Sequence, residues 1–146
     1  MNSSQKATGA LEDVKIPVKL KLSALWAATL FLYAYGDIFG FFRPDVIESV
    51  KAGKIAGFQI NQVFLLAVSI YILIPSTMVF LTLVLKPEVN RRANLIMSLA
   101  YFATIVLSAI GETWAYYVFL SLAESVLTLL IVWHAWKWPQ RQVSAL

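Results

Sequence analysis

Four long apolar stretches constrain the fold of this chain more than any other feature of its sequence. They cover residues 22–42, about 58–85, about 93–110 and about 114–136. Each reaches or exceeds the roughly 18–20 residues that a helix needs to cross about 30 Å of hydrocarbon. Because a segment inside lipid must satisfy its own backbone polar groups, we expect all four to be α-helices. The sequence therefore predicts an all-α integral membrane protein, with a bundle of four transmembrane helices over residues 22–138.

The composition agrees with a membrane protein and excludes several kinds of site. Hydrophobic residues make up 60% of the 146 residues and charged residues 14%, whereas soluble domains carry about 25% charged residues. The chain has no cysteine and one histidine, His134, so disulfides, thiolate metal sites and a bis-histidine haem within one chain are excluded. We expect His134 to be an interfacial residue, and we expect neither a cofactor nor a metal site.

The distribution of basic residues predicts the topology. Nine of the Lys and Arg residues lie in the two tails and in the loop between the second and third stretches, and three lie on the other side. This asymmetry predicts that both termini are cytoplasmic, and it explains the net charge of +4 better than nucleic-acid binding does. Residues 1–21 and 139–146 are then cytoplasmic tails, and residues 14–22 form an extended or interfacial segment. The first apolar stretch is too long for a signal peptide, so we expect it to be retained.

The loop after the first stretch, residues 43–57, is predicted to contain a short amphipathic helix on the outer surface. Pro44 suits the first turn of a helix, and Asp45 and Glu48 favour its positive N-terminal end. Gly53 is expected to end this helix.

Two further features predict how the membrane helices are shaped and packed. Pro75 lies inside the second stretch and predicts a kink, with the hydroxyls of Ser76 and Thr77 available to satisfy the freed backbone. Gly36 and Gly40 form a small-xxx-small pattern in the first stretch, which is typical of a close helix crossing.

Carboxylates inside apolar stretches are the main candidates for function. Asp37 lies toward the outer end of the first stretch and Glu124 near the middle of the fourth, whereas Glu112 is expected to be a solvated loop residue. A charged carboxylate near the bilayer centre costs about 2.5 kcal/mol or more, and no Lys or Arg lies within the apolar stretches to pair with it. Each acid is therefore protonated, hydrogen-bonded to neutral groups or neutralised by a bound cation, and a purely structural role for Asp37 stays open.

Neutral polar residues near these acids complete the predicted site. Polar side chains recur at helical spacing along all four stretches, and we expect most Ser and Thr among them to serve helix packing. The residues expected to assist Asp37 and Glu124 in binding a ligand or cation are Tyr33, Gln59, Asn61, Gln62 and Tyr101.

Several segments carry a resemblance to a known family. They read YAYGDIFGFFRP, GFQINQ and IPSTMVFLTLVLKPEVNRRAN, followed by YY and a mid-helix AES. Over roughly residues 22–138 the chain resembles a family of small bacterial four-helix membrane proteins of unknown function. The resemblance implies the four-helix fold and a bacterial cytoplasmic (inner) membrane location, and it implies no activity. The layout is also broadly similar to that of DoxX-type proteins, from which no residue role is transferred.

Three functional interpretations remain open. The leading one is a non-enzymatic membrane protein, expected to be homo-oligomeric, that binds or passes a small cation, a proton or an amphipathic ligand along a polar seam of the bundle. The second is a structural accessory or assembly subunit of a membrane complex. The third is a membrane enzyme that acts on a lipophilic substrate with a carboxylate as general acid or base.

Overall fold

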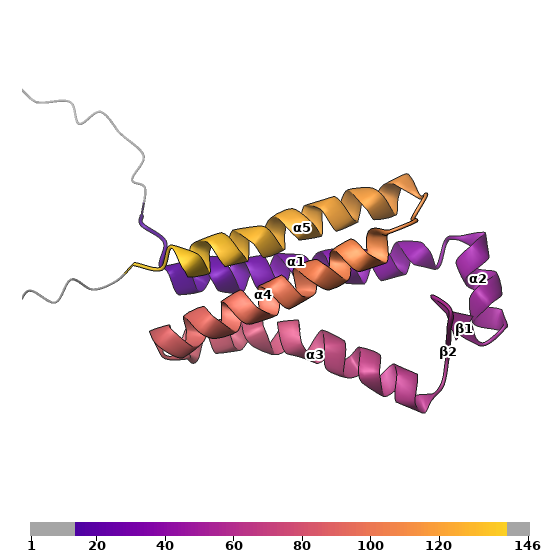
Figure 1. The fold of residues 1–146 in the computed structure, drawn as a ribbon, viewed down its shortest axis with the longest axis horizontal. Coiled ribbons are helices and arrows are strands. Elements are labelled where there is room, and N and C mark those ends of the chain that lie inside the picture. Colours follow the sequence, from indigo (N-terminus) through magenta and orange to yellow (C-terminus); the bar gives the residue numbers. More distant parts are fainter. Residues whose placement is uncertain (1–13, 140–146) are drawn as a thin grey trace, which may run out of the picture.

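A computed structural model describes residues 14–139 of the chain. This part is built mainly from long α-helices (Figure 1). Four helices have 22 or 23 residues each and are long and apolar enough to cross a membrane: α1 (Val18–Gly40), α3 (Gln62–Val84), α4 (Pro87–Ala109) and α5 (Ala115–Trp136). The predicted all-helical class and the four apolar helices are confirmed. The predictions for residues 1–13 and 140–146 lie outside the described residues.

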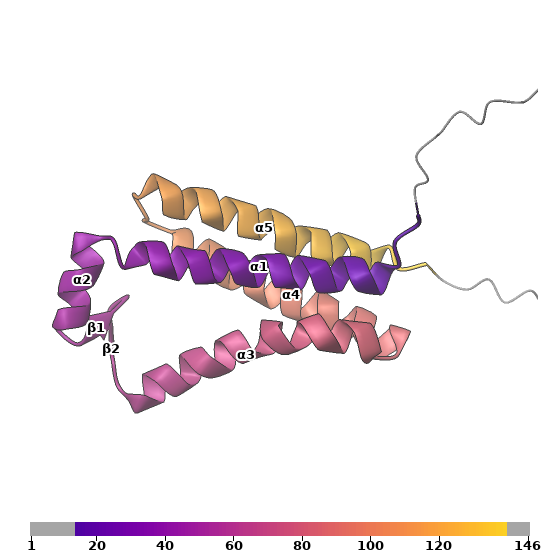
Figure 2. The same ribbon diagram turned by 180° about the vertical axis from the view of Figure 1, so that it is seen from behind.

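The helices form a bundle with its connections divided between two ends (Figures 1 and 2). The described chain begins and ends at the same end of the bundle, which we call the terminal end. The opposite end, called the α2 end, carries the short helix α2 (Pro44–Lys51) and a hairpin of β1 (Lys54–Ile55) and β2 (Phe58–Gln59). α3 packs against α1 toward the terminal end and diverges from the other helices toward the α2 end.

The core of the bundle lies toward the terminal end. Its buried apolar side chains are those of Leu22, Trp26, Met78, Tyr101, Ile131 and Ala135. Beside them, the indole Nε1 of Trp26 donates to Asn94 Oδ1 at 2.8 Å, and Asn94 Nδ2 donates to Asn90 Oδ1 at 2.7 Å. Asn90 Nδ2 in turn donates to the carbonyl of Thr82 at 2.5 Å. The polar stripe of α4 therefore links α1 and α3 through buried hydrogen bonds, as expected for interhelical packing.

The start of α1 differs from the sequence prediction. We expected residues 14–22 to be extended or interfacial, but the helix begins at Val18 directly after Pro17. Lys19 Nζ donates to the carbonyls of Leu83 and Leu85, at 3.1 and 2.7 Å. These are carbonyls at the C-terminal end of α3, which have no partner within their own helix. The lysine thus caps a neighbouring helix, a tertiary contact that favours helix in a segment that was expected to be extended or interfacial.

The starts of α3 and α4 also differ from the prediction. Residues 58–61 were expected in the second membrane helix, but Phe58 and Gln59 pair with β1 across a turn in which Ala56 and Gly57 have positive φ. α3 begins only at Gln62. α4 begins at Pro87 rather than near residue 93, because proline fits the first turn of a helix. The predicted short helix is present as α2, and Gly53 with φ +72° follows its end.

Pro75 lies inside α3 and leaves the carbonyl of Tyr71 without its intrahelical donor. We expected Ser76 and Thr77 to compensate, and their hydroxyls do donate to the carbonyls of Ile72 and Ile74. The carbonyl that Pro75 frees is instead bonded by the phenol of Tyr101 from α4. Sequence reasoning missed this compensation because its donor lies on another helix.

The glycine pair of α1 does not mark a close helix crossing, so this prediction is wrong. A Cβ placed on Gly36 would meet Leu120 Cδ1 at 3.7 Å, and one on Gly40 would meet the Tyr116 hydroxyl at 4.0 Å. These are ordinary van der Waals contacts with side chains of α5. Among residues 14–139, no neighbouring backbone approaches closely enough to require glycine at either position.

Candidate functional site

A cavity of about 380 Å³ lies among all four long helices, in the half of the bundle nearer the α2 end. α1 contributes Tyr33 and Asp37 to its lining, and α5 contributes Glu124. The other polar lining residues are Tyr71 from α3, Thr104 and Ser108 from α4, and Tyr117 and Ser121 from α5. The size falls within the range of about 300–1,000 Å³ that is usual for small-molecule sites.

Two carboxylates from different helices share this cavity. Glu124 is 8% exposed, while Asp37 remains exposed in the isolated chain where it lines the cavity. Both side chains line the same cavity. None of the lining residues is Lys or Arg. The cavity is therefore acidic, and its carboxylates lack a basic partner among the residues that line it.

Aromatic rings form the wall of the cavity on the side of α1 and α3. Tyr33 stacks on Tyr71 with ring centroids 6.4 Å apart and an angle of 27°. Tyr101 packs behind them, 4.7 Å from Tyr71, and meets Trp26 edge-on at 5.8 Å. The Tyr33 hydroxyl is shielded from solvent and has no hydrogen-bond partner among residues 14–139. These contacts fix the rings beside the two carboxylates.

The predicted site residues divide into two groups. Tyr33, Asp37 and Glu124 come together at the cavity, and Tyr101 supports its wall from behind. The three amide residues of the prediction, Gln59, Asn61 and Gln62, are exposed and do not line it.

The amides lie elsewhere because the second membrane helix begins later than expected. Gln59 is in β2, and Gln62 is the first residue of α3. The side chain of Asn61 caps α3 by accepting a hydrogen bond from the backbone N–H of Phe64 at 2.9 Å. α3 also diverges from α1 at this end (Figure 2), which carries its first turn away from Asp37.

Tyr71 is the main site residue that sequence reasoning missed. It lies in a strongly apolar stretch, in which an aromatic residue does not stand out from its neighbours. The available signal was its position four residues before Pro75, where a carbonyl is left free and a polar neighbour is expected. Ser108 and Ser121 belonged to the recognised polar stripes but were expected to serve packing.

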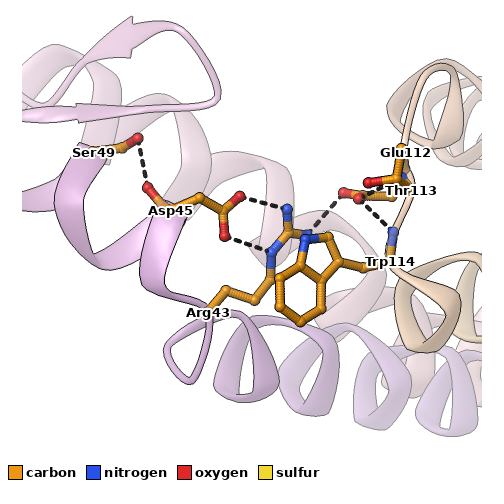
Figure 3. A network of polar contacts seen from close by, with 6 residues as sticks. All are labelled: Arg43, Asp45, Ser49, Glu112, Thr113 and Trp114. Carbon is orange, nitrogen blue, oxygen red and sulfur yellow. Dashed lines mark hydrogen bonds and ion pairs between the residues drawn. The ribbon is translucent and has the colours of Figure 1, made fainter.

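A network of polar contacts centred on Arg43 lies at the α2 end of the bundle (Figure 3). Arg43 Nη1 donates to Glu112 Oε2 at 2.9 Å, and its Nε and Nη2 donate to the two oxygens of Asp45 at 3.3 and 2.8 Å. The guanidinium also lies 4.8 Å from the centre of the Trp114 ring. Glu112 Oε1 accepts from the backbone N–H groups of Thr113 and Trp114. The prediction of a solvated Glu112 is therefore wrong, since its side chain is 16% exposed and paired.

The network alters the acidity of its members. The Arg43 hydrogen bond holds the pKa of Asp45 below its ordinary value. Burial pushes the pKa of Glu112 upward, but the bond from Arg43 and the two backbone N–H groups together outweigh burial and lower it. Both carboxylates are therefore ionised near neutral pH. The ion pair joins the end of α1 to the loop between α4 and α5.

The arrangement limits the chemistry that the cavity can perform. Within residues 14–139, no three His, Cys, Asp or Glu side chains converge as a metal site would require, and Ca²⁺ takes six to eight oxygen ligands. His134 lies in the last turn of α5, at the terminal end and away from both carboxylates. The cavity can instead exchange protons through its carboxylates or hold a positively charged group between them.

Comparison with protein families gives one match. The model described as "Family of unknown function (DUF6326)" matches residues 14–145. Neither the curated proteins nor the solved structures contain a match to this chain. The resemblance to an uncharacterised family is thereby confirmed, and the match extends beyond the segments that suggested it.

Proposed function

The chain belongs to the DUF6326 family, whose description assigns no activity, and we propose its function from the geometry of the cavity. The proposed function is that of a non-enzymatic membrane protein that binds or passes a cation, a proton or an amphipathic ligand among its four helices. One observation carries this proposal: Asp37 and Glu124, from different helices, line one cavity that has no basic residue in its lining. An unpaired carboxylate in apolar surroundings is costly, and a bound proton or cation removes that cost.

The proposal includes an orientation in a bacterial cytoplasmic membrane. Both termini are placed in the cytoplasm, as the excess of Lys and Arg at that end supports. The α2 end and the cavity then lie toward the outer surface. A kink at Pro75 would carry the first half of α3 away from α1, in agreement with the divergence seen in Figure 2.

The first half of α3 offers an apolar surface that either lipid or a second protein can cover. It exposes apolar side chains on several faces, among them Val63, Leu65, Leu66 and Ile70. We propose that a second copy of the chain covers part of this surface within the membrane. The same observation favours the second candidate function, an accessory subunit, in which a different membrane protein occupies this surface. Mass measurement of the complex extracted from its native membrane separates the two assemblies.

Carboxyl labelling in the membrane tests the proposed function. Dicyclohexylcarbodiimide is an apolar reagent that modifies carboxyl groups in apolar surroundings, and peptide mass spectrometry locates the modified residue. We expect Glu124 to be modified in the full chain in lipid vesicles, and we expect Na⁺, tetraphenylphosphonium or a rise in pH to slow this reaction. Glu88 is the control, because it lies in the exposed first turn of α4 outside the cavity.

The proposal has a clear contrary outcome. If Glu124 stays unmodified, or if no cation and no change of pH alters its rate of modification, the carboxylates do not exchange with a ligand or proton. Asp37→Asn and Glu124→Gln would then also leave cation binding unchanged, and the cavity would be only a packing defect.

A further inference from the structure

We infer that the cavity binds an organic cation, an amine or quaternary ammonium group that carries an apolar body. Asp37 and Glu124 would neutralise its charge, and the rings of Tyr33 and Tyr71 would contact its cationic group and apolar body. This inference rests on the proposed function and selects one ligand class from those that it admits.

The charge of the lining selects a cation over an anion or a neutral ligand. Two carboxylates and no Lys or Arg line the cavity, and Glu124 is 8% exposed. Charges interact more strongly beside low-dielectric protein than they do in bulk water, and Glu124 is the more buried of the two acids. An anionic ligand would add a third negative charge to this site. A cationic ligand supplies the missing partner of both acids.

The size of the cavity selects an organic cation over a bare metal ion. A metal ion needs convergent oxygen ligands at about 2.3–2.6 Å, as Ca²⁺ sites show. No such convergence of three acidic or histidine side chains exists in the described part of the chain. The volume of about 380 Å³ instead suits a ligand with many carbon atoms.

The lining of the cavity matches both parts of such a ligand. Cations are attracted to the faces of aromatic rings, and this attraction is the usual means of recognising quaternary ammonium groups. Tyr33 and Tyr71 supply rings next to the acids, with Tyr117 from α5 in the same lining. Val68, Ile72, Ile105 and Leu120 supply the apolar contacts. An acidic lining with rings and aliphatic side chains complements an amphipathic cation.

The matched pair of tetraphenylphosphonium and tetraphenylborate tests the inference. The two ions have nearly the same shape and carry opposite charges. With the full chain in lipid nanodiscs, we expect saturable binding of radiolabelled tetraphenylphosphonium and at least about tenfold weaker binding of tetraphenylborate. Equal binding of both ions would overturn the inference without the need for any variant.

Variants then test which side chains contact the bound cation. Glu124→Gln should weaken tetraphenylphosphonium binding at least about tenfold, whereas Glu88→Gln should leave it unchanged. Tyr33→Leu removes a ring and should weaken binding roughly three- to tenfold. Tyr33→Phe keeps the ring and should weaken binding less than Tyr33→Leu does. Unchanged binding in Glu124→Gln would overturn the inference.

The carbodiimide reaction separates failure of this inference from failure of the proposed function. If tetraphenylphosphonium does not bind but Na⁺ or pH still changes the modification of Glu124, the ligand is a small cation or a proton and the organic-cation inference is wrong. If neither tetraphenylphosphonium, Na⁺ nor pH has an effect, the proposed function is wrong as well.

Discussion

The ion pair between Arg43 and Glu112 joins the connection between α1 and α2 to the loop between α4 and α5, and its contribution to stability can be measured directly. We expect Glu112→Gln, which keeps the size of the side chain and removes its charge, to destabilise the folded state. The Nη1–Oε2 distance is 2.9 Å, and the two side chains are 12% and 16% exposed. The contact is therefore neither a surface pair nor a fully buried one.

The expected loss in the free energy of unfolding lies between the values for exposed and for buried ion pairs. Exposed ion pairs contribute about 0.2–1 kcal/mol, and breaking a buried pair costs about 3–5 kcal/mol because one charge is left without a partner. Arg43 retains its two bonds to Asp45 in the variant, so its charge is not left unpaired. We therefore expect Glu112→Gln to lower the free energy of unfolding by about 2 kcal/mol. Asp45→Asn is the control and should have a smaller effect, because the Asp45 side chain is 56% exposed.

The effect should depend on pH in a defined direction. The pKa of Glu112 is lower in the folded chain than its ordinary value, so the pair stabilises the fold above the unfolded-state pKa of about 4.3. This stabilisation is lost as the pH falls through the folded-state pKa. The difference between the unsubstituted chain and Glu112→Gln should thus be full at pH 7 and shrink on acidification below about pH 4.

Unfolding in mixed micelles with increasing sodium dodecyl sulfate, followed by tryptophan fluorescence, measures this difference. In the background of Arg43→Gln, the substitution Glu112→Gln should cost less than half of its value alone, since its main partner is already absent. A loss below about 0.5 kcal/mol at pH 7, within the range of an ordinary surface substitution, would refute the reasoning. An equal loss at pH 3 and pH 7 would refute the assignment of the effect to an ionised Glu112.

Two further substitutions test the buried polar contacts by the same unfolding measurement. Tyr101→Phe removes the donor to the Tyr71 carbonyl and should cost about 1–3 kcal/mol; in a Pro75→Ala background, where the backbone N–H returns, it should cost less than half as much. Asn94→Ala leaves the buried indole N–H of Trp26 without its acceptor and opens a cavity, so we expect a loss of about 3 kcal/mol. A neutral result for either would show that water or a shifted side chain replaces the lost partner.

The long helices could be predicted because a backbone that crosses lipid must satisfy its own polar groups, which leaves few structures other than the α-helix. Length and apolarity were sufficient for α1, α3, α4 and α5, and local turn chemistry was sufficient for α2 between Pro44 and Gly53. The ends of the membrane helices could not be read in this way. Lys19 lies in α1 and caps α3 by contacts 64 and 66 residues away in sequence, and such a contact leaves no local pattern.

In the candidate site, the residues that could be predicted were those whose side chains are unusual in an apolar helix. Asp37 and Glu124 were found because carboxylates are rare in apolar helices. The amides of Gln59, Asn61 and Gln62 were expected to assist the two acids, an expectation that failed because α3 begins only at Gln62 and diverges from α1 (Figure 2). The pair of Arg43 and Glu112, 69 residues apart, depends on how two loops meet, which spacing along the chain does not specify.

Buried polar side chains are hydrogen-bonded to one another in the half of the bundle toward the terminal end, whereas the acids of the cavity have no basic partner in its lining. This contrast favours a ligand site. Toward the terminal end, Asn90 and Asn94 form hydrogen bonds with one another and with neighbouring helices. One Lys or Arg facing the cavity would have done the same for Glu124, yet Arg43 lies outside the cavity lining and pairs with Asp45 and Glu112 instead. The pair of Arg43 and Glu112 joins the end of α1, which carries Asp37, to the loop that leads into α5, which carries Glu124. It therefore ties together the ends of the two carboxylate-bearing helices without engaging Asp37 or Glu124, as the proposed ligand site requires.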